Sequence, residues 1–320
     1  MRASTIAMAL AALLPALPPD GGPTPILRGE GDAEVAPHGE GNVYAPDVIR
    51  DGPTLRMWYG GQGRDGHDRI ALAESSDGGA TWAHKGVVLA DDRANHVNDP
   101  SVVRVGGLFF LFYTRTARDV VDRIDVAISA DGRAWEPKGV ALDVGPPGSW
   151  DSLSVGRPSV IHEGGLFRMW YDGRRDFPPG APVKGVPISP ASARHVGYAT
   201  SRDGLHWTRS GPSPVFDHDA GGVDVKRVGG SLVMLYESRD GTRAASGTDG
   251  LSWTDRGLLA PRSGAPIDAF GHVTPFLLLD PGGGPARLYV GAASATTWDR
   301  NQIAWLAIDR AGLDRMAARP

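Results

Sequence analysis

Several polar residues stand in otherwise apolar segments of this sequence, where they could carry chemistry. They are Asp47, Asn98, Asp99, Arg157, Asp224, Lys226 and His272, and Glu237 ends a neighbouring apolar run. Carboxyl groups that converge can divide acid–base work, because one donates a proton while another activates water. Arginine and lysine instead favour an anionic group. The residue types therefore indicate either acid–base catalysis or an anion-binding site.

Each of these residues also has a purely structural explanation. An aspartate before proline, such as Asp99, often begins a strand with a turn, and Asp47 can likewise be part of the scaffold. Glu237 can open an exposed hairpin, His272 can be a buried histidine with satisfied hydrogen bonds, and Arg157 can bridge two structural units. The choice between these explanations depends on the elements that position the residues.

These elements form a repeated unit. An apolar run, a small polar step, Asp-Gly and Trp occur four times, in residues 70–82, 124–135, 196–207 and 244–253. A second apolar run contains Tyr59, Tyr113, Tyr171, Tyr236 or Tyr289, which lie 53 to 65 residues apart. Each unit holds runs of strand length separated by turn pairs such as Gly-Gly and Asp-Gly. Four antiparallel strands per repeat are typical of a propeller blade, so five units predict an all-β, five-bladed β-propeller.

The Asp-Gly pairs are expected to turn the chain between the third and fourth strands of a blade. The carboxylate accepts backbone N–H groups, glycine supplies a positive φ, and the tryptophan packs under the next blade. Asp77, Asp131, Asp203 and Asp249 are therefore predicted scaffold residues, and "SSDGGATW" resembles the Asp box of other propellers. The fifth unit lacks a fourth strand, and residues 24–29 are expected to supply it and so close the ring.

Composition narrows the function classes. The 320-residue chain has a net charge of −4 without a basic block, so nucleic acid is a poor partner, and no cysteine, which excludes disulfides. Residues 1–22 resemble a signal peptide, with an apolar run too short to span a bilayer. We therefore expect a secreted or periplasmic monomer without a membrane span, with residues 23–320 as one propeller domain. The proline-rich insertion 176–193 is expected to shape one face of the ring.

The sequence resembles the five-bladed propeller glycoside hydrolases of families 43, 32 and 130. The resemblance lies in the proline-containing apolar run that begins most units, such as "YAPDVI", in the "MWY" run that follows it, and in "GYATSRDGLHW". The resemblance implies a carbohydrate substrate and no required cofactor. "HVNDPSV" resembles a strand with an essential carboxylate, which implies a catalytic role for Asp99. Asp47 opens the first unit, where such enzymes usually hold the general base. "FGHV" resembles a Gly-His pair whose imidazole faces a central ion or water, which implies that His272 lies near a central Ca²⁺ or water.

The sequence departs from this family pattern at the general acid. The family places a glutamate two residues before a proline, but Gly156 stands there, with Arg157 beside it. Hydrolysis of a glycosidic bond needs a proton donor and a carboxylate that activates water. The remaining candidates for the acid are Glu237, Asp224 and Asp151. Alternatively, Arg157 and Lys226 mark an anion site, as phosphorolysis or an acidic sugar would require.

Further residues are predicted to contact the substrate. Trp150 lies outside the repeated tryptophan positions, so it can stack on a sugar or pack on the rim. The other predicted contacts are Tyr44, Asn98, Asp151, Arg157, Asp224, Lys226 and His272.

The first hypothesis is an inverting glycoside hydrolase, in which Asp47, Asp99 and Glu237 are catalytic and Asp99 orients the acid. Its acid and base carboxyls are expected about 6.5–9.5 Å apart. The second is a non-catalytic propeller that binds carbohydrate or protein, favoured by the missing glutamate. A glycoside phosphorylase and a sialidase-like enzyme remain further alternatives, although sialidases normally have six blades.

Overall fold

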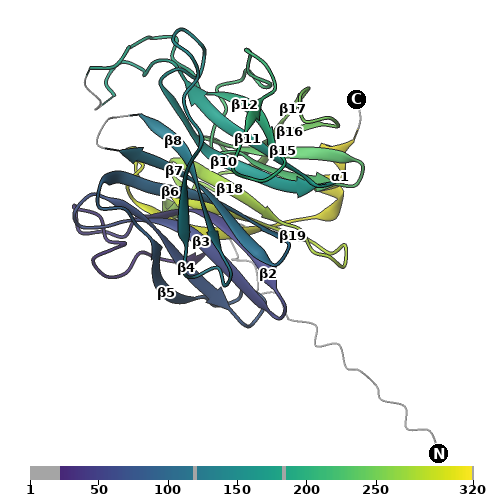
Figure 1. Cartoon of the computed structure of the whole chain (residues 1–320). Helices are drawn as coiled ribbons and strands as arrows, with labels where there is room; N and C mark the ends of the chain where they lie inside the picture. Colours follow the sequence, from purple (N-terminus) through teal and green to yellow (C-terminus); the bar gives the residue numbers. More distant parts are fainter. Residues whose placement is uncertain (1–21, 118–120, 182–184, 319–320) are drawn as a thin grey trace, which may run out of the picture.

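The computed structural model describes residues 22–117, 121–181 and 185–318 (Figure 1). Its regular elements are antiparallel β-strands, apart from the short 3-10 helix η1 (Pro266–Asp268) and the helix α1 (Arg310–Ala317). The predicted all-β class is therefore confirmed. The predicted signal peptide, residues 1–22, lies outside the described residues except for residue 22.

Three sheets contain four strands each, and these strands follow one another in sequence and in space. The first contains β2 (Val43–Asp51), β3 (Thr54–Gln62), β4 (Asp68–Ser75) and β5 (Ala83–Leu89). The second contains β6 (Ala94–Val105), β7 (Leu108–Ala117), β8 (Asp122–Ser129) and β9 (Glu136–Leu142). The third contains β10 (Ser154–Glu163), β11 (Leu166–Arg174), β12 (His195–Ser201) and β13 (Thr208–Arg209).

The other strands form an eight-stranded sheet that divides into two groups of four. One group holds β14 (Asp224–Val228), β15 (Ser231–Ser238), β16 (Gly241–Gly247) and β17 (Thr254–Pro261). The other holds β18 (Gly271–Leu278), β19 (Ala286–Ala293), β20 (Asn301–Ile308) and β1 (Thr24–Leu27). The two groups meet where Ser238 pairs with His272. We call the three sheets and these two halves groups one to five, in chain order.

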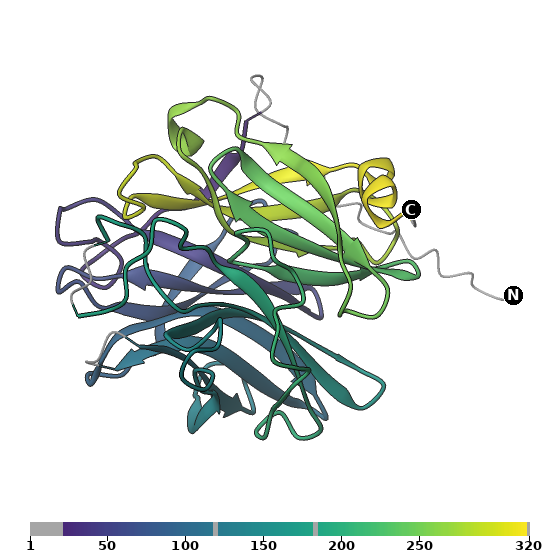
Figure 2. The same cartoon turned by 90° about the horizontal axis from the view of Figure 1, so that it is seen from above.

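The start of the described chain pairs with its end. β1 runs antiparallel to β20, with Thr24 opposite Trp305 and Leu27 opposite Ile303. Figure 2 shows this purple strand beside the yellow C-terminal strands. The prediction that this segment completes the fifth group is confirmed, because a strand from the N-terminal end covers what would otherwise be an exposed sheet edge.

Aromatic side chains pack the groups against one another. Trp58 of the "MWY" run is fully buried, lies 5.9 Å from Phe109 of the next group and donates from Nε1 to the carbonyl of Gly132 (2.9 Å). The tryptophans after the Asp-Gly turns pack the opposite way from our prediction: Trp135 contacts Trp58 of the preceding group at 6.2 Å. The "MWY" tryptophan hydrogen-bonds the next group's turn, so it and the tryptophan of that turn pack together between the two groups.

The Asp-Gly aspartates hold their turns through hydrogen bonds. Asp131 Oδ1 accepts the backbone N–H groups of Arg133 (2.8 Å) and Ala134 (2.9 Å), as well as the hydroxyl of Ser129 (2.9 Å). Gly132 follows with a φ of 72°, which a residue with a side chain adopts at a cost. These contacts fit the scaffold role that the sequence predicts.

Replacing Asp131 with alanine should lower the free energy of unfolding by about 1 kcal/mol, because two backbone N–H groups lose their acceptor. Urea denaturation of the variant and the parent chain measures this difference. Activity or ligand binding per folded molecule should be unchanged. A folded variant that had lost function would contradict the scaffold role.

Candidate functional site

Each group has a residue with a left-handed backbone at the equivalent place, in its first strand or just before it. Its φ is 52° at Ala45, 51° at Asp99, 46° at Arg157 and 44° at Thr274, while Gly222, just before β14, has a φ of 57°. Residues other than glycine rarely adopt such values, so the surrounding structure must hold them. Strand pairing shifts register at the four non-glycine positions, as in β-bulges. The bulges determine which side chains reach the centre.

A narrow central cavity is lined by the same three consecutive positions from all five groups. They are Ala45, Pro46 and Asp47; Asp99, Pro100 and Ser101; Arg157, Pro158 and Ser159; Gly222, Val223 and Asp224; and Thr274, Pro275 and Phe276. We call these positions one, two and three of each triplet. Asp47 and Asp99 therefore line one cavity, as predicted for residues that act together, but Asp99 stands at position one and Asp47 at position three.

Position three joins neighbouring groups. In the first four groups its side chain accepts a hydrogen bond from a backbone N–H of the following first strand, at 2.8–3.0 Å where the acceptor is Ser101, Ser159 or Asp224. The four pairs, donor first, are Val102 to Asp47, Val160 to Ser101, Val225 to Ser159 and Leu277 to Asp224. Because two of the four acceptors are serines, this contact requires a polar acceptor and no titratable group.

Asp47 and Asp224 also interact electrostatically. Asp224 Oδ1 lies 2.6 Å from Lys226 Nζ, which in turn lies 4.0 Å from the centre of the Phe276 ring. Burial raises the pKa of Asp47 to about 7; Lys226 opposes this shift and Asp224 adds to it. Lys226, predicted to mark an anion site, is thus already paired with a carboxylate.

A second set of acceptors comes from the ends of the second strands. Thr114, Asp172 and Glu237 occupy this place in groups two, three and four. Each accepts the N–H of the position-one residue in the next group: Arg157 (2.8 Å), Gly222 (3.2 Å) and Thr274 (3.0 Å), respectively. The second strands therefore bring carboxylates to the same end of the cavity as Asp99 and Arg157.

Five charged residues meet at this end, and we call Asp99, Arg157, Asp172, Arg194 and Glu237 the mouth cluster. Arg157 Nη1 lies 2.8 Å from Asp172 Oδ2, and Arg194 Nη1 lies 3.6 Å from the same oxygen. Arg194 Nη1 also contacts Glu237 Oε1. The side chain of Arg157 is 35% exposed whereas that of Asp172 is 3% exposed, so the cluster runs from solvent into the protein.

The pKa values of two carboxyl groups in the mouth cluster shift in opposite directions. Burial raises the pKa of Asp99 to about 7, although Arg157 and a hydrogen bond with Thr114 oppose the shift. Burial also disfavours ionised Glu237, but Arg194, Arg157 and the N–H of Thr274 outweigh it and lower its pKa to about 2. Near neutral pH, Asp99 can therefore hold a proton while Glu237 is ionised.

Sequence reasoning predicted Asp99, Arg157 and Glu237 but missed Asp172 and Arg194. Asp172 had a signal, because it follows the tyrosine of "MWYDG", just as Glu237 follows the tyrosine of its own unit. Arg194 had none: it follows the proline-rich insertion and reaches Glu237 of the next group across 43 residues.

Tyr44 and Asn98, predicted substrate contacts, lie beside the mouth cluster. Asn98 Nδ2 donates to the Tyr44 hydroxyl (2.9 Å) and to Asp68 Oδ2 (3.4 Å). Burial, together with the charges of Asp68 and Asp99, raises the pKa of Tyr44 well above its usual value. Tyr44 thus stays protonated and can donate a hydrogen bond.

Trp150 and Asp151 lie away from the central cavity lining. Trp150 stacks on Tyr171 at 5.9 Å between ring centres, and Asp151 is buried, 2.9 Å from Arg209 Nε and 3.2 Å from the Tyr171 hydroxyl. Asp151 is thus bound to an arginine and a tyrosine within group three, in an environment that does not suit a general acid.

His272 is also outside the cavity lining and is fully buried. Thr242 Oγ1 lies 3.0 Å from its Nδ1, and Asp268 Oδ2 lies 3.4 Å from its Nε2. Both ring nitrogens therefore have protein partners, which does not fit the predicted ion at this histidine. Among residues 22–117, 121–181 and 185–318, no group of three or more His, Asp or Glu side chains could hold a metal. No helix in the described part of the chain is long and apolar enough to cross a membrane.

Comparison with known proteins gives similar proteins but no matching family model. An uncharacterized protein of Mycobacterium tuberculosis is 34% identical over 138 residues, which are 40% of this chain and 45% of that protein. The chain therefore spans less than half of this relative's length. An extracellular exo-alpha-(1->5)-L-arabinofuranosidase of Streptomyces chartreusis is 24% identical over 217 residues, 63% of this chain and 56% of the enzyme.

Solved structures match over almost the whole chain. One described as a glycoside hydrolase superposes with a TM-score of 0.68 at 18% identity, over 90% of this chain and 91% of the other. Others, at 15 to 17% identity, are titled as glycoside hydrolases of families 43, 117 and 130. The chain therefore has the propeller-like fold of these glycoside hydrolases.

Proposed function

We propose that the protein is a five-bladed propeller glycoside hydrolase whose active site is the mouth cluster. The architecture is supported by the cavity lining, to which all five groups contribute the same triplet. It is also supported by the eight-stranded sheet, whose halves meet at one residue pair. Localisation outside the cytoplasm is part of this proposal, on the strength of the signal-like residues 1–22.

The observation that carries the proposal is that two carboxyl groups in one cluster have very different pKa values. Asp99 has a pKa of about 7 and Glu237 a pKa of about 2, although both are largely buried. Carboxyl groups whose environments push their pKa values apart are suited to opposite roles, one as proton donor and the other as the ionised carboxylate that acts on water. Arg157, whose pKa Asp172, Asp99 and Glu237 all raise, electrostatically links the two.

The roles that we propose differ from those expected from sequence. Asp99 donates its proton to the leaving glycosidic oxygen while the bond from that oxygen to the anomeric carbon breaks. Ionised Glu237 orients the attacking water, accepts its proton and stabilises the positive charge on the sugar. Asp47 is assigned to the scaffold, because two serines make the equivalent backbone contact in other groups. Water attack on the face opposite the leaving group would give inversion.

Incubation of the purified chain with aryl glycosides and neutral polysaccharides, with and without inorganic phosphate, tests the proposal. A hydrolase releases the free sugar at the same rate in both conditions, and the Asp99→Asn variant releases it at least about 10²-fold more slowly from polysaccharides and from aryl glycosides with poor leaving groups. If no glycoside is cleaved in either condition, the hydrolase proposal fails.

A non-catalytic binding module is the second candidate, and Gly156 favours it. A Cβ at this position would lie 3.0 Å from Thr114 Oγ1 and 3.2 Å from Thr114 Cγ2. The place of the family's acidic residue is thus closed by a side chain of the neighbouring group. Under this reading, the mouth cluster binds sugar hydroxyls and the screen yields binding without product.

Phosphorolysis is favoured by a single feature, the Arg174 side chain. Among the described residues it has no ion pair or hydrogen bond, and its guanidinium lies 4.9 Å from the centre of the Phe177 ring. Burial and the positive charges of Arg194 and Arg157 lower its pKa. An oxyanion would relieve this repulsion, so cleavage that requires phosphate would identify Arg174 as a contact of that anion.

A further inference from the structure

A contact between the second and fourth strands recurs in three of the five groups. The residue two positions after the turn tryptophan reaches the hydroxyl of the second-strand tyrosine. The three pairs are His84 Nδ1 with Tyr59 (3.1 Å), Arg209 Nε with Tyr171 (3.1 Å) and Asp255 Oδ1 with Tyr236 (2.8 Å). In these groups a polar side chain therefore contacts the tyrosine hydroxyl.

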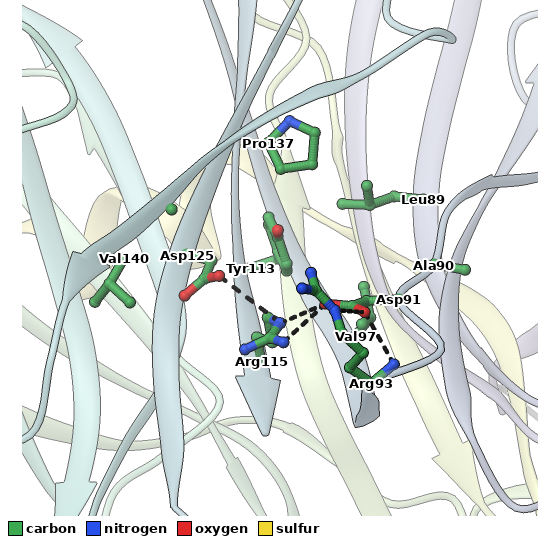
Figure 3. A pocket seen from close by; sticks show the side chains of 11 residues that line it. Leu89, Ala90, Asp91, Arg93, Val97, Tyr113, Arg115, Asp125, Pro137 and Val140 are labelled. Carbon is green, nitrogen blue, oxygen red and sulfur yellow. Dashed lines mark hydrogen bonds and ion pairs between the residues drawn. The ribbon is translucent and has the colours of Figure 1, made fainter. Parts of the chain in front are cut away.

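Group two breaks this pattern. The position equivalent to His84 is Pro137, which follows Trp135 by two residues and has no polar side-chain atom. The hydroxyl of Tyr113 has no hydrogen-bond partner among the residues that the structure describes, and Figure 3 draws no contact to it. The substitution thus leaves an open space where groups one, three and four place a polar side chain.

That space is a cavity of about 860 Å³ between groups one and two, separate from the central cavity (Figure 3). Its lining is Leu89, Ala90, Asp91, Arg93, Val97, Tyr113, Arg115, Asp125, Pro137, Gly139 and Val140. The volume lies in the range of small-molecule sites, which usually combine apolar walls with a few placed polar groups.

The polar groups of the cavity are charged but balanced. Arg115 donates from Nη2 (2.8 Å) and Nε (3.0 Å) to Asp91 Oδ2, and its Nε lies 3.9 Å from Asp125 Oδ2. Arg93 pairs with Asp91 on the other side. Two acidic and two basic residues leave no net charge, so a neutral ligand is favoured over an ionic one.

Two polar atoms in the cavity lack partners. Asp125 Oδ1 is buried without a hydrogen bond in the described structure. The Tyr113 hydroxyl has no hydrogen bond to the other side chains drawn in Figure 3. A buried acceptor without a donor is costly, and a ligand hydroxyl would satisfy it. Burial also raises the pKa of Asp125, although the charge of Arg115 opposes this shift.

We propose that this cavity is a second carbohydrate site, which binds one neutral sugar unit of a glycan apart from the mouth cluster. Sugar hydroxyls donate to Asp125 and Tyr113 and accept from Arg115, while the apolar walls cover the C–H faces of the ring. The choice of a sugar among neutral polyhydroxyl ligands rests on the proposed function. The existence of the cavity and of its unpaired atoms is independent of that function.

Two tryptophan variants give a matched test. Val140 lines the cavity and is 49% exposed, so Val140→Trp should block the cavity without disturbing the core. Val87 stands at the same place in group one, is 41% exposed and is not among the residues that line this cavity. Both substitutions are made in the full chain carrying Asp99→Asn, so that bound glycan is not cleaved.

Affinity electrophoresis in gels containing neutral arabinan, galactan, mannan or xylan measures binding. At least one polysaccharide should retard the Val87→Trp protein. Val140→Trp should be retarded less, with an apparent Kd for that polysaccharide at least about fivefold higher. Tyr113→Phe, which removes one hydroxyl and keeps the ring, should weaken binding about fivefold. With Asp99 intact, Val140→Trp should hydrolyse small aryl glycosides at the parental rate, a result that separates this site from the catalytic proposal.

The proposal is overturned if none of the four polysaccharides retards the chain, or if Val140→Trp and Val87→Trp are retarded equally. Stronger retardation by an acidic polysaccharide such as polygalacturonate than by any neutral one would also overturn it, since the cavity carries no net charge.

Discussion

Replacing Asp99 with asparagine should lower turnover by about 10²- to 10⁴-fold, the usual contribution of a proton donor, and should nevertheless make the protein more stable near pH 8. Asparagine tolerates the left-handed φ of 51° at this position at least as well as aspartate does. It also has no charge to bury, whereas Asp99 is 7% exposed. The variant therefore removes a proton donor and an ionisation cost together.

The sign of the stability effect follows from the pKa. The pKa of Asp99 rises from 3.8 to about 7 on folding, so its favourable contribution is complete below pH 4 and is lost as the pH rises through 7. The asparagine side chain does not titrate, so the variant's advantage should grow from pH 4 to pH 7, to at most about 4 kcal/mol. Thermal melts at pH 4, 6 and 8 measure it.

Asp47→Asn is the matched control, because Asp47 also has a pKa of about 7 on account of burial. It should show a similar pH-dependent gain in stability and retain turnover, since asparagine can still accept the hydrogen bond from Val102. If Asp47→Asn loses as much turnover as Asp99→Asn, the assignment of Asp47 to the scaffold is wrong.

Replacing Glu237 with glutamine should abolish turnover and cost about 3 kcal/mol of stability at pH 7, because the ion pair of the part-buried Arg194 is broken. The pKa of Glu237 falls from 4.5 to about 2 on folding, so its contribution is present above pH 4.5 and lost as the pH falls through 2. The deficit of the variant in urea denaturation should therefore shrink between pH 4.5 and pH 2.

Glu163→Gln serves as the control for this experiment. Glu163 pairs with Arg227 at 2.7 Å, but their side chains are 33% and 38% exposed, and such a surface pair contributes less than about 1 kcal/mol. If both variants lost the same free energy of unfolding, the ion pair of Glu237 would contribute no more to stability than an exposed surface pair.

The repeat could be predicted from the sequence because it rests on local signals. Turn pairs such as Asp131-Gly132 mark strand ends, and the apolar runs mark strands. The missing strand of the fifth group made residues 24–29 the natural partner of the chain's end, and the pairing of Thr24 with Trp305 bears this out. The direction in which the turn tryptophans pack could not be predicted in this way, because it depends on how neighbouring groups pack against each other.

The site was harder to predict because its residues come from different groups. Asp47 and Asp99 both neighbour a proline, but one follows it and the other precedes it, and the β-bulge turns this small shift into two different environments. Arg194 joins Asp172 and Glu237 only after the groups pack together. The cavity at Tyr113 becomes visible only when Pro137 is compared with its counterparts in folded groups.

The dependence of hydrolysis on the leaving group tests most directly whether Asp99 is the proton donor. Aryl glycosides of the sugar identified in the screen, with phenols from 2,4-dinitrophenol to unsubstituted phenol, are compared in the parent chain and in Asp99→Asn. A good leaving group departs without a proton. The variant should thus cleave the dinitrophenyl glycoside at close to the parental kcat and the phenyl glycoside about 10³-fold more slowly. An equal loss on every leaving group would contradict the account and place Asp99 outside the proton transfer.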